Sequence, residues 1–111
     1  MSTVSVKSGD LVVLDPGESR IIQFDWDAEN LATSVTINTS TFTISAITQG
    51  GATALTKDNP SILTGSRKTQ VRVIATTATE GDLYWLTNTI LTGENPTQTK
   101  EQSIKILVQN K

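Results

Sequence analysis

The chain lacks two residue types that carry much of protein chemistry, because its 111 residues include no cysteine and no histidine. The absence of cysteine excludes disulfides, thiolate metal sites and cysteine nucleophiles. The absence of histidine excludes the Ser-His-Asp triad, the commonest general base and most zinc sites. Carboxylates and serine–lysine pairs are the catalytic groups that remain.

The chain also lacks a strong net charge and long apolar segments. The net charge is −2, whereas a surface that binds nucleic acid through its phosphates usually carries a basic excess. Apolar runs such as Leu11 to Leu14 fall far short of the roughly 20 residues that cross a bilayer. The amino terminus lacks the apolar core of a secretion signal. We therefore expect a soluble protein without a secretion signal, and with neither nucleic acid nor a membrane as partner.

Threonine, valine and isoleucine are abundant, and their branched side chains suit a pleated, half-buried sheet. Glycine and proline clusters recur between short alternating runs, a spacing that is typical of an all-β sandwich or barrel. A turn is predicted at Asp58 to Pro60, and a bulge or bend is predicted near residues 38–40, where the alternation changes parity. We predict strands over residues 11–14, 19–26, 33–47, 52–56, 69–75, 81–92 and 103–108.

One spacing favours an immunoglobulin-like arrangement. Glu80 precedes Tyr84 by four residues near the start of the penultimate strand, as in the tyrosine corner, and Leu86 stands where antibody domains place a cysteine. We predict an immunoglobulin-like antiparallel β-sandwich of about seven strands, forming one domain over residues 1–111 with an N-terminal arm at residues 1–7. A small sandwich rarely provides the concave pocket of an enzyme, so we expect no catalytic activity, no cofactor and no metal.

Two charged clusters could in principle bind ligands. Asp25, Asp27 and Glu29 resemble calcium ligands, but the glycine and glutamate that a calcium loop needs are absent, which favours a solvated strand end. A small basic group lacks the spacing of a phosphate loop, so a solvated face is favoured over a contact with an acidic partner. Its members are Arg67, Lys68 and Arg72.

The alternation in the strand after Gly81 places Tyr84, Leu86 and Ile90 on the core face. Leu83, Trp85 and Leu91 then face outward, where a solvated sheet would normally carry polar residues. Either a loop or the N-terminal arm covers these side chains, or they form a contact patch for another subunit. The predicted partner interface consists of Leu83, Trp85 and Leu91 together with Val4 and Val6 of the arm.

Four stretches stand out when they are read in order: FDW at 24–26, TFTIS at 41–45, GDLYWLTNTI at 81–90 and QSIKILV at 102–108. Together they resemble small immunoglobulin-like virion proteins of tailed bacteriophages. In that group an Asp-Trp pair closes an early strand, and a Tyr-x-hydrophobic-Thr-Asn-Thr-Ile strand precedes a final Ser-Ile-x-hydrophobic-x-Val strand. The third stretch is the most specific, and the match departs at residues 29–32, where the group tends to have a Gly-Asp turn.

The resemblance implies a structural role in a virus particle. It suggests a capsid decoration (cement) subunit that binds the major capsid protein lattice, present in many copies or as a homo-oligomer, and assembled in the host bacterial cytoplasm. A tail or neck accessory protein is an alternative, since the same fold serves there. A carbohydrate-binding or host-adhesion module is another, and it would use exposed aromatic residues and the loops near Gly50 and Asp58.

Overall fold

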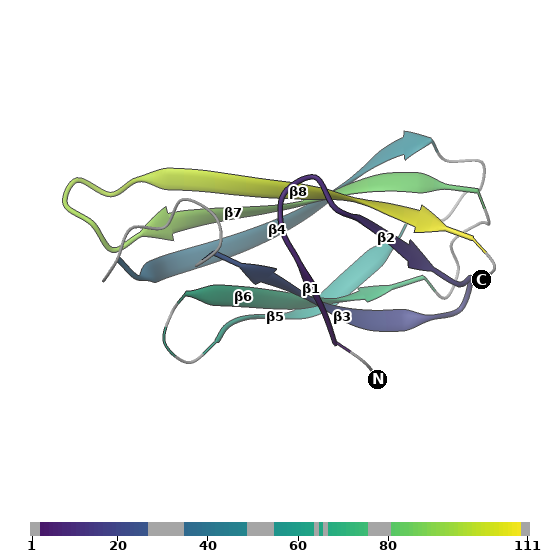
Figure 1. Ribbon diagram of the computed structural model, residues 1–111, viewed down its shortest axis with the longest axis horizontal. Coiled ribbons are helices and arrows are strands. Elements are labelled where there is room, and N and C mark those ends of the chain that lie inside the picture. The colour runs from purple at the N-terminus through teal and green to yellow at the C-terminus, as the bar shows by residue number, and fades with distance from the viewer. Residues whose placement is uncertain are drawn as a thin grey trace.

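The computed structural model describes residues 3–26, 35–48, 55–63, 65, 67–75 and 81–109. These residues form eight strands and no helix, arranged as two packed four-stranded sheets (Figure 1). The strands are β1 (Thr3–Val6), β2 (Leu11–Leu14), β3 (Ser19–Asp25), β4 (Ile37–Thr48), β5 (Thr56–Ile62), β6 (Lys68–Ile74), β7 (Leu83–Thr92) and β8 (Thr99–Val108).

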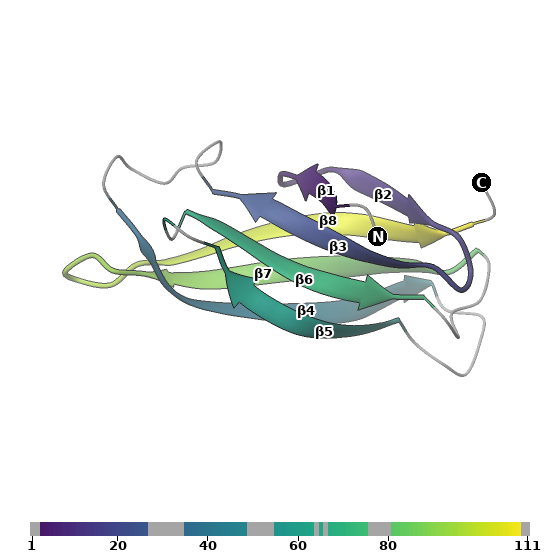
Figure 2. The same cartoon turned by 90° about the horizontal axis from the view of Figure 1, so that it is seen from below.

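The first sheet has the order β1-β3-β6-β5 and the second has the order β2-β8-β7-β4. In Figure 1 the second sheet lies above the first. The expected β-sandwich is confirmed, but its sheets are mixed rather than antiparallel, because β1 pairs in parallel with β3 and β2 in parallel with β8. A short connection through Gly9, whose φ is 92°, carries the chain from one sheet to the other (Figure 2). Each of the two short strands therefore joins the edge of a different sheet.

The N-terminal arm predicted over residues 1–7 is, over Thr3–Val6, a strand of the sandwich. Val4 and Val6 pair with Ile22 and Phe24 of β3. Val6 is 4% exposed and belongs to the core, while Val4 is partly buried against it. The alternation Val-x-Val supplies an apolar face that would be costly to leave in water, which accounts for the docking of this segment.

Most of the strand predictions agree with the structure, and the parity change in β4 coincides with a register shift between Ile37 and Thr39. The turn predicted at Asp58 to Pro60 is wrong, because these residues lie within β5. A register shift between Asp58 and Ser61, with φ of 51° at Asn59, interrupts that strand. An edge strand tolerates proline at such a bulge, since no ladder hydrogen bond is lost there. Of the strand predicted at 52–56, residues 52–54 lie outside the described residues.

The core lies between the sheets and is made of side chains from both. Phe24 of β3 and Phe42 of β4 meet across it with ring centroids 5.9 Å apart. Tyr84, Leu86 and Ile90 of β7 are fully buried, as their parity predicted. The Tyr84 hydroxyl donates a hydrogen bond to Oδ2 of Asp82 at 3.0 Å. The Glu80 of the predicted tyrosine corner lies outside the described residues.

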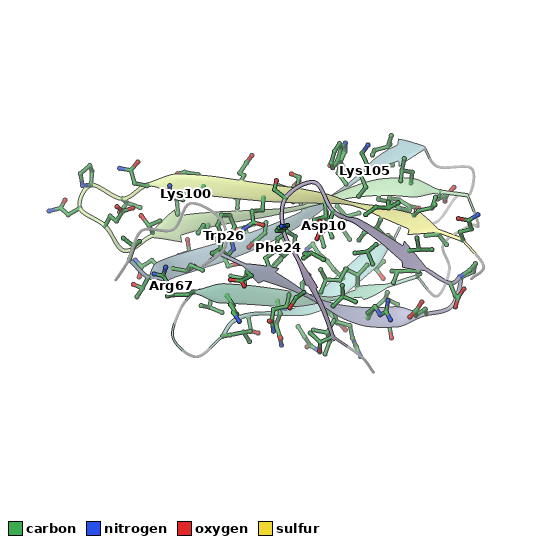
Figure 3. All side chains as sticks on the ribbon, viewed as in Figure 1. Asp10, Phe24, Trp26, Arg67, Lys100 and Lys105 are labelled. Carbon is green, nitrogen blue, oxygen red and sulfur yellow. The ribbon has the colours of Figure 1, made fainter. Side chains whose placement is uncertain are left out.

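A buried polar network joins the two sheets inside this core. The indole N–H of Trp26 donates to Oδ1 of Asn88 at 3.0 Å and to Oγ1 of Thr69 at 3.3 Å. Thr69 donates to the same Asn88 oxygen, and the Asn88 amide donates to Oγ of Ser40 at 2.8 Å and to the carbonyl of Thr41 at 3.1 Å. Figure 3 shows Phe24 and Trp26 between the sheets. Asn88 of β7 thereby satisfies polar groups from β4, from β6 and from the end of β3, which fixes how the sheets are stacked.

Candidate functional site

The outer face of the second sheet carries the exposed tryptophan. Strand register aligns Leu11 of β2, Lys105 of β8, Trp85 of β7 and Ser45 of β4 in one row across the sheet. Leu11 is 55% exposed and Trp85 is 38% exposed, so both present apolar surface to solvent. Directly aligned neighbours in a sheet have their β-carbons about 4.5–5.5 Å apart, so this row is a continuous strip of surface.

A second row lies beside it and is apolar over three strands. Val13 of β2 aligns with Leu107 of β8, and Leu107 aligns with Leu83 of β7. These three side chains are partly buried. Ile47, in the register shift at the end of β4, is 42% exposed. We call the surface formed by these two rows the Trp85 patch, and its apolar members are Leu11, Val13, Ile47, Leu83, Trp85 and Leu107.

Lys105 is the charged member of this surface. Its Nζ lies 5.3 Å from the centroid of the Trp85 ring. In Figure 3 Lys105 stands on the outer side of the upper sheet. A cation over an indole at an exposed site stabilises the pair by about 0.5–1 kcal/mol. The contact restrains the indole on the sheet and places one positive charge beside the apolar strip.

Leu91 shares the outward face with Trp85 but lies outside the Trp85 patch. Six residues along a strand separate the two by about 20 Å. Hydroxyl-bearing rows lie between them: Thr87 contacts Ser103 of β8, with their oxygens 2.9 Å apart, and Thr89 donates to Oε2 of Glu101 at 3.3 Å. Leu91, 39% exposed, is therefore an isolated apolar side chain on a polar surface.

The structure thus divides the five predicted interface residues among three places. Leu83 and Trp85 lie together in the Trp85 patch, and Leu91 stands apart on the same sheet. Val4 and Val6 pack towards the core from the first sheet. Sequence reasoning missed Leu11 and Val13. The sequence did contain a signal for them: all four residues of β2 are apolar, and alternation along a strand turns two of the four side chains inward and two outward.

Two members of the predicted basic group, Arg67 and Arg72, have different partners. Arg72 forms an ion pair with Asp58 on the neighbouring strand, with Nε 2.7 Å from Oδ1 and a second contact between Nη2 and Oδ2. The hydrogen bond to Arg72 lowers the pKa of Asp58, and the same bond raises the pKa of Arg72. Arg67 instead donates through Nη1 to the carbonyl of Val35 at 2.5 Å. Arg67 and Arg72 therefore do not converge on one anion site.

The acidic cluster falls mostly outside the described residues, since Asp27 and Glu29 are not among them. Within the described ranges, no group of three or more acidic, histidine or cysteine residues could hold a metal ion. Of the surface hollows lined by described residues, two have volumes of about 180 Å³ and 260 Å³, the larger lined in part by Asn59 and Arg72. Typical ligand pockets occupy about 300–1,000 Å³, so both hollows are small for a substrate.

In the part of the chain that the structure describes, no helix has the length and apolar character to span a bilayer. Comparison with known proteins finds no family model and no curated protein that matches the chain.

Proposed function

We propose that this protein is a non-enzymatic structural subunit of a tailed-bacteriophage particle, and that it decorates the capsid by docking on the major capsid protein lattice. The observation that carries the proposal is the Trp85 patch, a contiguous apolar strip on the outer face of a sheet. Tryptophan is among the residues most enriched at the energetic centres of protein interfaces. A patch of this kind on a monomer usually marks a contact site.

The strand order supports an immunoglobulin-like assignment within this proposal. Taking β1, β3, β6 and β5 as strands A, B, E and D, and β4, β7 and β8 as strands C, F and G, reproduces the strand order of a constant-type domain. β2 is then an additional strand beside β8, and the parallel pairs β1–β3 and β2–β8 depart from the antiparallel sheets of that domain. Tyr84 then stands near the start of strand F, where the tyrosine corner places it. The assignment departs from antibody domains in the buried tryptophan, since Trp26 follows β3 rather than lying on β4.

The composition of the patch indicates the chemistry of its partner. Leu11 and Trp85 would be desolvated against an apolar pocket, and each square ångström of apolar surface removed from water contributes about 25 cal/mol. Lys105 at the same surface favours a carboxylate on the partner, which would set the orientation of docking. We therefore expect the capsid surface to offer an apolar hollow flanked by an acidic residue.

The carbohydrate-binding alternative receives less support from this geometry. Sugars stack on the face of an exposed aromatic ring, and Trp85 is the exposed aromatic among the described residues. Lys105 already lies over that ring at 5.3 Å. A tail or neck accessory protein would use the same patch against a different virion protein, so the position of the subunit on the particle separates that function from capsid decoration.

Particle occupancy tests the proposal. Particles produced without this protein are incubated with purified wild-type protein or with Trp85→Ala, and the bound copies are counted after sedimentation. Truncating a tryptophan at the centre of an interface costs about 2 kcal/mol or more, which corresponds to binding at least about 30-fold weaker. Electron microscopy of the loaded particles then locates the wild-type subunit on the capsid or on the tail.

Leu91→Ala is the matched control, because Leu91 has nearly the same exposure as Trp85 on the same strand and face. This variant is expected to bind like the wild type, and unfolding curves verify that both variants fold. Normal occupancy by Trp85→Ala, or equal losses in the two variants, would rule out the Trp85 patch as the docking surface.

A further inference from the structure

The four sheet edges differ in how they discourage pairing with another chain. Exposed strand edges present unpaired backbone N–H and C=O groups, and proteins protect them with short strands, charges, proline or bulges. β1 and β2 are each four residues long. β5 carries Lys57, Asp58 and Pro60 together with a register shift. Three of the four edges therefore have a recognisable protective feature.

The edge formed by β4 has none of these features along its centre. β4 has 12 residues, Ile37–Thr48, without a charged residue or a proline. Among the described residues β7 is the strand that pairs with β4, which leaves its other side at the edge of the sheet. Register shifts occur near its two ends, while the eight residues from Thr39 to Ala46 pair with β7 without interruption. This central stretch is long and regular enough to accept another strand.

We propose that two copies of this protein pair through the central edge of β4, antiparallel and about a two-fold axis. The resulting sheet would be continuous across both copies. The proposal does not depend on the virion function, since it follows from the edge itself. Main-chain hydrogen bonds would supply the attraction, as in other examples of strand addition.

The side-chain pattern of β4 limits the possible registers, and among them we propose the one centred on Thr43. Residues opposite each other in an antiparallel pair point to the same face, so each core-facing residue must meet another core-facing residue. Centring the axis on Thr43 places Phe42 opposite Ile44 of the second copy on the core side. It also places Thr41 opposite Ser45 on the outer side. Ile44 is only partly buried in one copy, so this register removes further apolar surface from water.

A second copy fits this edge better than a charged partner peptide does. The outer side chains that would meet are hydroxyl-bearing residues, which pair favourably with one another across strands. With no charge on the strand, two identical edges meet without repulsion. An isologous pair also closes on itself, because each edge is used once.

The same geometry has a consequence for the Trp85 patch. A two-fold axis perpendicular to the sheet keeps the outer faces of both copies on one side. Both Trp85 patches would therefore face the same surface, so that a dimer could dock through two contacts at once. Two linked contacts bind much more tightly than one when the geometry allows both.

Analytical ultracentrifugation of the purified full chain tests the pairing at concentrations up to about 100 μM, a range that detects weak contacts. The wild type is expected to form dimers. Thr43→Lys places a positive charge opposite its copy at the axis, and we expect dimerisation about 2- to 5-fold weaker. Thr43→Glu is expected to act in the same way, whereas a mixture of the two variants is expected to restore a heterodimer.

Thr87→Lys is the matched control, because Thr87 is the direct neighbour of Thr43 on β7. Its side chain lies on the same face of the sheet, but β7 is an inner strand and does not form the edge. The variant adds the same charge to the same face and should leave the dimer intact. A monomeric wild type, or species larger than a dimer, would overturn the proposal. Equal effects of Thr43→Lys and Thr87→Lys, or no heterodimer in the mixture, would overturn it as well.

Discussion

Replacing Asn88 with alanine is the most informative test of how the sandwich is held together. Asn88 is fully buried between Leu86 and Ile90, where the strand pattern would otherwise place an apolar residue. Its oxygen accepts from Trp26 at 3.0 Å and from Thr69 at 2.5 Å. Because both hydrogens of its amide group are also used, the alanine variant loses four side-chain hydrogen bonds.

The size of the effect follows from the groups that remain. Trp26 keeps one acceptor, Oγ1 of Thr69, at 3.3 Å. The carbonyl of Thr41 and the hydroxyl of Ser40 lose the amide donor. Each buried polar group left without a partner costs about 1–3 kcal/mol, and the vacated volume adds to this. We expect Asn88→Ala to lower the free energy of unfolding by about 3–5 kcal/mol, a large part of the 5–15 kcal/mol typical of a domain.

Urea unfolding monitored by tryptophan fluorescence measures this loss. Thr87→Ala is the control, since Thr87 neighbours Asn88 on the outer face and loses a single hydrogen bond, to Ser103, so stability should change by about 1 kcal/mol or less. Asn88→Asp adds a second readout, because burial raises the pKa of a carboxyl group. Its stability should be greatest at acid pH and should fall as the pH rises, while the carboxyl group ionises.

A loss below about 1 kcal/mol in Asn88→Ala would refute the reasoning, since it would mean that the network contributes little beyond packing. A flat pH dependence in Asn88→Asp, relative to the wild type, would also contradict it. A double-mutant cycle with Trp26→Phe then measures the coupling directly, because phenylalanine lacks the indole N–H.

Three further predictions concern other parts of the fold. Val6→Ala should lower the free energy of unfolding by about 1–3 kcal/mol in urea titrations, since Val6 is buried, and no change would show that the segment is a free arm. Burial, with the Asp82 hydrogen bond, raises the pKa of Tyr84, so stability should fall above about pH 10 as the hydroxyl ionises. Tyr84→Phe should reduce that slope in unfolding curves, and an unchanged slope would contradict the assignment. Arg72→Ala should raise the pKa of Asp58 in an NMR titration towards its ordinary value, and an unchanged titration would mean that the ion pair does not persist in solution.

The β-sandwich and most strand positions could be predicted from sequence because alternation with a period of two is a local property. That pattern placed Tyr84 and Leu86 inside and Trp85 outside, and the structure agrees. The failures have tertiary causes, because pairing with distant strands overrode the local signal. Asp58 to Pro60 carries a strong turn signal, but pairing of β5 with β6 overrides it by means of a bulge. The residues 3–6 give a short apolar signal, and only docking against β3 turns them into a strand.

The candidate site depended on information that no local pattern contains. The sequence by itself determined that Trp85 faces outward, since side-chain direction follows from strand parity. Only the tertiary structure decided that Leu11 and Lys105 lie beside Trp85 and that Leu91 does not. Register between strands that are distant in the chain is set by the packing of the whole core, including the contacts of Asn88 across the sheets. The face on which a side chain lies is a property of its own strand, whereas the side chains that lie beside it are decided by the assembled sheets.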